Sequence, residues 1–154
     1  QLTIKNQIND EKHILETNSF GHLSTIMPDG SPHVTPVWID FKLEENILLI
    51  SMFENCQKDK NLKQNPFFAI SVNNPNNPYN YIQIRVKSIG STLDEGGNFA
   101  DSLIRKYSKN NHQKYPLDPS KNLIIYSLKP LHISGWKKTS ADNFLTWLLT
   151  KEDT

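Results

Sequence analysis

Residues 21–63 read GHLSTIMPDGSPHVTPVWIDFKLEENILLISMFENCQKDKNLK, and this stretch decides the fold because it predicts three consecutive strands and a short basic helix. Pro28-Asp29-Gly30-Ser31 joins the first two strands, since proline presets φ at the first turn position and glycine accepts a positive φ. The second strand, His33–Phe41, carries Pro36, which cannot donate to a ladder. This strand therefore lies at an edge, at a bulge or at a split in the sheet.

The third predicted strand ends beside the start of the basic helix. This strand, Ile47–Phe53, is mostly apolar, as expected when both of its faces are buried. The helix is predicted over residues 57–65, with Lys58 near its start. Backbone N–H groups at a helix start are free and the lysine adds positive charge, so this junction is a candidate anion site. The alternative is an ordinary solvated lysine face.

The rest of the chain predicts further strands with short connections. The expected strands are residues 20–27, 33–41, 47–53, 67–73, 81–93 and 122–136, with an interruption at Pro130, and the expected helices are residues 9–18, 57–65, 99–107 and 140–150. A polar loop is expected over residues 74–80. Regular crossover helices do not separate the strands, which argues against a doubly wound parallel sheet. We expect a mainly β (α+β) fold, a six-stranded antiparallel barrel with a few flanking helices, as one domain over residues 1–154.

Composition excludes several classes of protein. The 154 residues carry 17 Lys and Arg against 16 Asp and Glu, a balance that argues against phosphate-driven nucleic-acid binding. No apolar run approaches the roughly 20 residues of a membrane span. The single cysteine, Cys56, excludes an internal disulfide framework and suits a cytoplasmic location. The histidines are not spaced as metal ligands, so no metal is expected. An oligonucleotide-binding barrel that uses aromatic stacking remains the least favoured alternative.

Two side chains, those of Cys56 and Trp38, each allow two interpretations. Cys56 could be a nucleophile, although a single thiol near a strand end is more often inert. Trp38 could stack on a ligand, although a tryptophan on a strand is more often part of the core. No motif for a nucleophile elbow, a phosphate loop or a dinucleotide fold is present.

Three motifs resemble those of one family. Residues 29–38, DGSPHVTPVW, resemble the D-G-x-P-x-V-x-P-V-W motif of the pyridoxamine 5′-phosphate oxidase-like superfamily, the FMN-binding split β-barrels. Residues 58–62, KDKNL, resemble its K-x-R-N-L element, and residues 77–85, NPYNYIQIR, resemble the N-P-Y-R-Y-x-x-I-R segment of its deazaflavin-dependent branch. The resemblance spans roughly residues 20–136 and is more specific than any single motif.

The resemblance implies a split barrel that forms a homodimer, with a flavin-type cofactor at each of two sites between the subunits. It implies an oxidoreductase that transfers hydride between FMN, or the deazaflavin coenzyme F-420, and a small organic substrate. A non-enzymatic flavin or haem carrier is the alternative. The residues carried over are Val34, Thr35, Pro36, Val37 and Trp38 at the ring edge, Ser51 and Lys58 at the phosphate, Lys60 and Asn61 supporting them, Asn77, Tyr79 and Gln83 along the ring or tail, and Trp136 and Lys137 from the partner chain. No catalytic residue is predicted.

Two departures from the family motifs bear on the cofactor. Lys60 and Asn80 stand where the motifs have arginine, and lysine cannot make the planar bidentate contact with phosphate. The Asn-Pro-Tyr segment favours the deazaflavin branch, whereas the missing arginine disfavours its long anionic tail. The sequence therefore leaves FMN and F-420 open.

Overall fold

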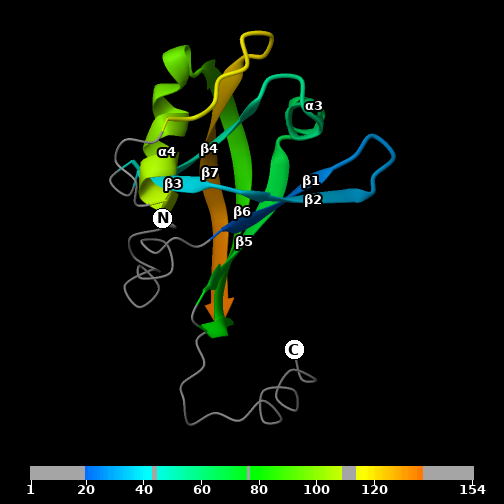
Figure 1. Cartoon of the computed structure of the whole chain (residues 1–154). Coiled ribbons are helices and arrows are strands. Elements are labelled where there is room, and N and C mark those ends of the chain that lie inside the picture. The colour runs from blue at the N-terminus through cyan, green and yellow to red at the C-terminus, as the bar shows by residue number, and fades with distance from the viewer. Residues whose placement is uncertain (1–19, 43–44, 76, 109–113, 137–154) are drawn as a thin grey trace.

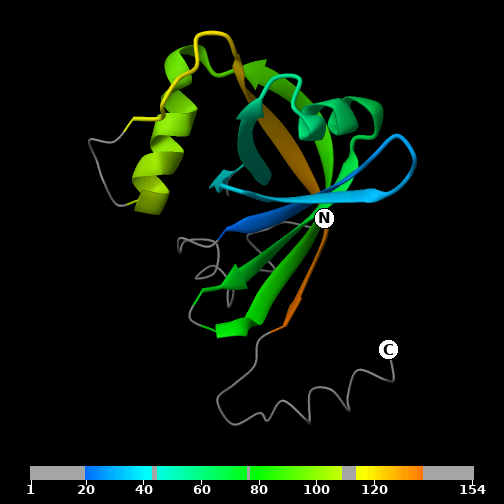
Figure 2. The ribbon, with the colours of Figure 1, turned by 45° about the vertical axis from the view of Figure 1, so that its right-hand side comes forward.

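The computed structural model describes residues 20–42, 45–75, 77–108 and 114–136, with the backbone alone at residues 77–80 and 136. The elements are β1 (Gly21–Ile26), β2 (Pro32–Val37), β3 (Ile39–Lys42), β4 (Ile47–Phe53), α3 (Gln57–Gln64), β5 (Phe67–Asn74), β6 (Asn77–Leu93), the 3-10 turn η1 (Glu95–Gly97), α4 (Asn98–Ser108) and β7 (Leu123–Trp136). The strands form one sheet in the order β2-β1-β5-β6-β7-β4-β3, and every neighbouring pair is antiparallel. The sheet curls around one interior, which confirms the split β-barrel (Figures 1 and 2).

Among the described residues the sheet has seven strands, so the prediction of six was wrong. The predicted second strand divides at Trp38, because the chain changes partners there: Val37 pairs with Gly21 of β1, whereas Ile39 pairs with Ile50 of β4. β2 and β3 are thus the two edges of the sheet, joined by a single residue. Pro36 lies in the edge strand β2, as the missing N–H of proline requires.

The core lies inside the curl of the sheet. Alternate residues of each strand point inward, and those that are almost completely buried include Leu23, Ile39, Leu48, Ile50, Ile70, Ile82, Ile84 and Leu128. Gly21 at the start of β1 leaves room for the buried Ile39 side chain of β3, because a Cβ there would lie 2.2 Å from Cδ1 of Ile39. The glycine therefore lets β1 lie close to the residue with which β3 begins.

Two long strands differ locally from the prediction. β6 begins at Asn77 and not at Tyr81, so the predicted loop over residues 74–80 is reduced to a tight connection after β5. β7 runs through Pro130 without interruption, because a shift of register there accommodates the proline. Val86 pairs with Pro130 and Arg85 with His132, which leaves Leu131 as the extra residue of a bulge.

Two helices in the described part of the chain flank the upper part of the sheet in Figure 1. α3 packs against β1 and β4, and α4 stands beside β3, where Lys106 donates to the Ile39 carbonyl. The carboxylate of Asp94 caps α4 by accepting hydrogen bonds from the N–H groups of Phe99 at 2.9 Å and Ala100 at 3.0 Å. Both helices were predicted within one residue of their observed bounds, whereas the helices predicted over residues 9–18 and 140–150 lie outside the described residues. Within the described part of the chain, no helix is both long and apolar enough to cross a membrane.

Candidate functional site

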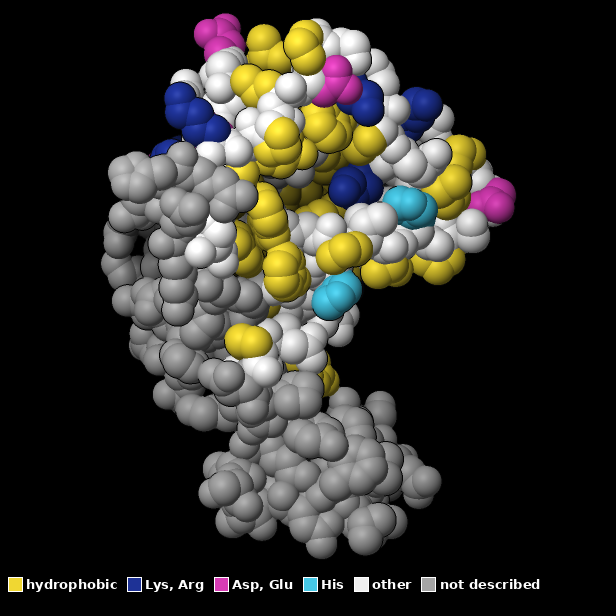
Figure 3. Space-filling view, in the orientation of Figure 1, with side chains coloured by type: hydrophobic (Ala, Val, Ile, Leu, Met, Phe, Trp, Pro, Cys, Tyr) yellow, Lys and Arg dark blue, Asp and Glu magenta, His cyan; other side chains and the backbone are white. Residues whose placement is uncertain are grey.

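A cleft of about 410 Å³ opens where the crossover between β2 and β3 faces the end of β4. Figure 3 shows the hollow between α4 and the β1–β2 hairpin, with hydrophobic side chains inside it and a basic side chain at its rim. Its lining residues are Phe20, Pro36, Val37, Trp38, Ser51, Met52, Phe53, Cys56, Lys58, Ala100, Leu103, Tyr115 and Leu123. A volume of this size is typical of pockets that hold small molecules or cofactors.

Most of the cleft wall is apolar, and several of its side chains are aromatic. Phe20 and Trp38 lie on the side of the crossover, Phe53 lies at the end of β4, and its ring centroid is 6.1 Å from that of Tyr115. Flat faces of this kind stack on planar ring systems and exclude water from them. The wall therefore suits a planar, largely apolar ligand.

The polar end of the cleft lies at the start of α3. Ser51, Cys56 and Lys58 line this end. The first backbone hydrogen bond of α3 runs from the N–H of Lys60 to the carbonyl of Cys56 at 3.0 Å, so the three preceding backbone N–H groups have no carbonyl partner within the helix. Free N–H groups, the helix dipole and the Lys58 ammonium together make this end of the cleft suitable for an anionic group.

A buried carboxylate fixes the start of α3. Asp59 is completely buried and accepts hydrogen bonds from the Tyr126 hydroxyl at 2.5 Å, the Asn55 N–H at 2.6 Å and the Lys63 ammonium at 2.9 Å. Burial acts to raise the pKa of Asp59, but these hydrogen bonds outweigh it and the pKa lies below its ordinary value. Burial and the neighbouring carboxylate raise the pKa of Tyr126 well above its ordinary value, so this hydroxyl keeps its proton.

A second buried contact ties α3 to β1. The amide nitrogen of Asn61 donates to the Thr25 hydroxyl at 3.0 Å, and its oxygen accepts from Gln57 at 2.8 Å. Asn61 and Thr25 are each 1% exposed. The helix start at the cleft is therefore held by polar contacts from two different strands.

The structure brings five of the predicted site residues together. Pro36, Val37, Trp38, Ser51 and Lys58 all line the cleft, although they come from β2, from the crossover after it, from β4 and from α3. The strand end and the helix start that the sequence predicted as an anion site thus face the proline-bearing strand across one cavity.

The other predicted residues near this end lie outside the cleft lining. Val34 is 60% exposed on the outer face of β2, and Lys60 is exposed on α3. Asn61 is buried on the side of α3 that contacts Thr25 of β1. Thr35 faces inward from β2, and its hydroxyl oxygen is buried without a hydrogen-bond partner among the described residues.

The residues predicted along the ring or tail lie on the long strands. Gln83 of β6 is exposed on the outer face of the sheet, in a register row that continues through Ser71 and His22 to Pro36 at the cleft. Three strand spacings separate Gln83 from Pro36, about 14 Å. The backbones of Asn77, Tyr79 and Trp136 lie at the far end of β6 and β7, and Lys137 lies outside the described residues.

Sequence reasoning missed the wall that α4 and its neighbours supply. The residues concerned are Phe20, Met52, Phe53, Ala100, Leu103, Tyr115 and Leu123. Each has an apolar or aromatic side chain that packs equally well in a core, so its residue type carries no sign of a ligand. Two signals were present in the sequence: Phe53 is adjacent to the predicted anion site, and Tyr115-Pro116 resembles part of a family motif.

Comparisons with known proteins agree with this geometry. Residues 10–137 match the family described as Pyridoxamine 5'-phosphate oxidase. A solved structure titled F420 Reductase is 31% identical, has a TM-score of 0.72, and the match covers 80% of this chain and 94% of that chain. No curated protein matches the sequence.

Two more distant structures share the fold. General Stress Protein 26 from Bacillus anthracis str. Sterne is 18% identical with a TM-score of 0.60, and the match covers 88% of this chain and 95% of that chain. A pyridoxamine 5'-phosphate oxidase-related, FMN binding protein from Nostoc punctiforme PCC 73102 is 16% identical with a TM-score of 0.59, and the match covers 86% of this chain and 83% of that chain. At these identities the similarity concerns the fold alone.

Proposed function

The chain belongs to the pyridoxamine 5′-phosphate oxidase family, and from this premise we propose that it is an oxidoreductase dependent on a flavin or deazaflavin. The proposed reaction is hydride transfer between the bound cofactor and a small organic substrate. The observation that carries the proposal is the single cleft that combines the Pro36–Trp38 crossover with Ser51 and Lys58.

The donor set of the cleft fits such a cofactor. Lys58, the Ser51 hydroxyl and the free N–H groups of α3 can bind a terminal phosphate, while Trp38 and Phe53 offer flat faces to a ring. When bound, the cofactor supplies the hydride chemistry, and the protein binds it, orients it and excludes water. The side chains in the lining that can titrate are Cys56, Lys58 and Tyr115, and we assign a catalytic role to none of them.

The proposal has two candidate cofactors, FMN and F-420. The structure titled F420 Reductase, at 31% identity, supports the deazaflavin. Lys60, at the position where the family motif has an arginine, is exposed on α3 and outside the cleft lining, so one cation, Lys58, remains in that lining. A single phosphate, as in FMN, needs fewer cations than the longer anionic tail of F-420.

Titration of the purified protein with FMN and with F-420, followed by quenching of tryptophan fluorescence, tests this proposal. We expect saturable binding of one of them, and saturable binding of neither contradicts the proposal. Lys58→Ala is expected to weaken binding about tenfold, because a charge-assisted hydrogen bond contributes about 1.5 kcal/mol. Lys60→Ala is the matched control on the same helix and is expected to change the dissociation constant less than about twofold.

Turnover separates an enzyme from a carrier. The reduced cofactor in the presence of quinones, enones, nitro compounds or tetrapyrroles is expected to be oxidised faster with the protein than without it. Binding without acceptor-dependent oxidation would instead support a non-enzymatic carrier on the same barrel.

A homodimer is part of the proposal. Phe67 is 52% exposed and Leu131 is 44% exposed, and with Arg85 they line a shallow groove of about 320 Å³ on the long strands. The row from Pro36 to Gln83 leads from the cleft onto the outer face of the sheet, where a second copy could complete the site. Sedimentation is expected to give twice the chain mass of 17.7 kDa, and a mass of one chain contradicts the dimer.

A further inference from the structure

Tyr107 of α4 lies in the middle of a stack of three aromatic rings behind the cleft. Its ring centroid is 5.5 Å from that of Trp38, with 14° between the ring planes, and 5.5 Å from that of Phe20, with 26° between the planes. Trp38 and Phe20 line the cleft, whereas Tyr107 is not among the lining residues. Tyr107 therefore supports the aromatic wall without forming its surface.

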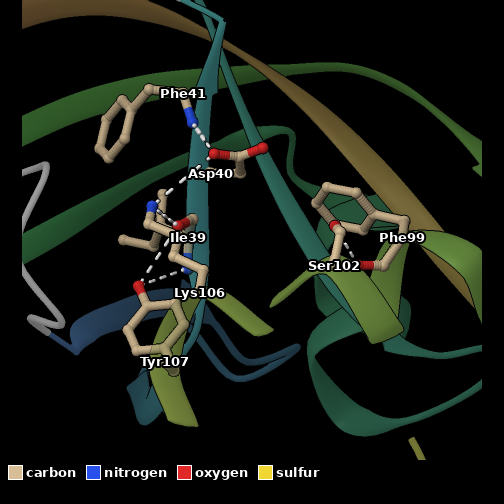
Figure 4. Close-up of polar contacts among 7 residues, drawn as sticks. All are labelled: Ile39, Asp40, Phe41, Phe99, Ser102, Lys106 and Tyr107. Carbon is tan, nitrogen blue, oxygen red and sulfur yellow. Dashed lines mark hydrogen bonds and ion pairs between the residues drawn. The ribbon is translucent and has the colours of Figure 1, made fainter. Parts of the chain in front are cut away.

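The hydroxyl of Tyr107 holds the strand crossover that carries Trp38. It accepts a hydrogen bond from the Ile39 N–H at 3.0 Å and donates one to the Ile39 carbonyl at 3.2 Å (Figure 4). Ile39 is the residue directly after Trp38 and begins the edge strand β3. One side chain thus bonds both backbone groups next to Trp38, at an edge where no further strand of the described residues pairs with β3.

Lys106 reinforces the same point of the backbone. Its ammonium donates to the Ile39 carbonyl at 2.7 Å, lies 3.7 Å from the Asp40 carboxylate, and sits 5.5 Å from the centroid of the Tyr107 ring. Burial raises the pKa of Tyr107, so its hydroxyl stays protonated near neutral pH and can keep both hydrogen bonds.

We propose that Tyr107 is a positioning residue of the cleft: its ring sets the plane of Trp38, its hydroxyl fixes the crossover, and together they shape the wall against which the cofactor ring lies. The inference rests on the proposed function, because it assigns the wall to a planar cofactor. It does not make Tyr107 a catalytic residue, since no part of Tyr107 lines the cleft.

Near-ultraviolet circular dichroism of the cofactor-free protein measures the Trp38 environment, with Trp38→Phe identifying the band. Tyr107→Leu removes the stacked ring and is expected to abolish that band and to weaken FMN or F-420 binding about fivefold, in line with the strength of an aromatic pair. Tyr107→Phe keeps the ring and loses only the hydroxyl, so we expect it to keep the band and to weaken binding about twofold.

The matched control is Phe99→Leu, which removes a half-buried aromatic ring from the same helix but outside the three-ring stack. It is expected to lower the melting temperature while leaving the Trp38 band and the dissociation constant unchanged. If Tyr107→Leu also leaves the Trp38 band and the dissociation constant unchanged, the positioning role is overturned. If Tyr107→Leu does not fold, Tyr107→Phe takes its place, and an unchanged dissociation constant in that variant overturns the role of the hydroxyl.

The Trp38 circular dichroism band and the dissociation constant test this inference and the proposed function separately. Loss of the Trp38 band in Tyr107→Leu supports the packing role whether or not a cofactor binds. Failure of the unmodified protein to bind either cofactor overturns the proposed function, and the binding half of the inference with it.

Discussion

The two sides of the cleft satisfy their polar groups in opposite ways. On the α3 side, Asp59 and Asn61 are almost completely buried, and each has hydrogen-bond partners from other elements. On the β2 side, the Thr35 hydroxyl oxygen and Nδ1 of His33 are buried with no hydrogen-bond partner among the described residues. β2 is also an edge strand, so one row of its backbone groups faces no neighbouring strand.

This difference indicates that the two sides of the cleft contribute to binding in different ways. A helix start whose side chains are already held by buried hydrogen bonds costs little to organise when an anion binds its free N–H groups. The edge strand β2 instead has a row of backbone groups that faces no strand among the described residues, and these groups keep hydrogen-bonding capacity for a ligand or for a second copy of the chain. The α3 side therefore supplies rigidity, and the edge of β2 supplies open backbone positions.

Asp59→Ala is expected to have the largest effect on stability. The substitution leaves the Tyr126 hydroxyl and the Asn55 N–H without their acceptor, so the free energy of unfolding should fall by about 3 kcal/mol. Urea denaturation measures this change. Asp118→Ala is the control: this carboxylate accepts a hydrogen bond from the Ser120 N–H in an exposed turn, and its loss should lower the free energy of unfolding far less. Equal effects of the two substitutions would show that the α3 side is not anchored as described.

Tyr126→Phe is expected to have the next largest effect. It removes one of the three donors to Asp59 while keeping the ring, which is 3% exposed, in the core. The loss should be about 1.5 kcal/mol, because the hydrogen bond is made to a charged acceptor. The same substitution in the Asp59→Ala background should cost much less, and full additivity of the two would contradict their direct coupling.

Much of the fold was predictable because local rules and tertiary structure agree. The turn at Pro28–Ser31, the edge position of Pro36 and the two helices follow from residue chemistry that the neighbours do not override. The division at Trp38 was not predictable, because it depends on a change of strand partner. Similarly, the bulge at Leu131 arises from the register against β6, which the sequence of β7 does not contain.

The polar end of the candidate site was predictable, and its apolar wall was not. Lys58 follows a strand end, and that position alone indicated an anion site. Leu103 and Tyr115 reach the cleft only because α4 and the segment after it face the end of β4 across the cleft, and their residue types also suit a core. The role of Tyr107 depends on contacts with Trp38 and Ile39, which lie 69 and 68 positions earlier in the chain.

The effect of pH on stability should be smaller than the effect of either substitution. Protonation of Asp59 removes its charge but leaves an oxygen that can accept a hydrogen bond. Its pKa in the folded protein lies below 3.8, the ordinary value, so its contribution is complete above about pH 4 and is lost as the pH falls through the folded value. The difference in stability between the unmodified protein and Asp59→Ala should therefore be constant above about pH 4 and should narrow below it. A constant difference down to about pH 2 would contradict the lowered pKa.

Substitution of two threonines, one in β1 in contact with α3 and one in β2, is expected to have the smallest effects on stability. These two substitutions also discriminate best between the two sides of the cleft. Thr25 of β1 accepts a hydrogen bond from Asn61 at 3.0 Å, so Thr25→Val should destabilise the protein by about 1 kcal/mol. Thr35 of β2 carries a buried hydroxyl oxygen with no described partner, so Thr35→Val should leave stability unchanged or raise it by about 0.5 kcal/mol. Both values come from thermal or urea unfolding of the cofactor-free protein. Because both substitutions replace a hydroxyl by a methyl group, a loss of stability at Thr25 without a loss at Thr35 reflects the hydrogen-bond partner. A comparable loss from both would show that the Thr35 hydroxyl is as well bonded as that of Thr25.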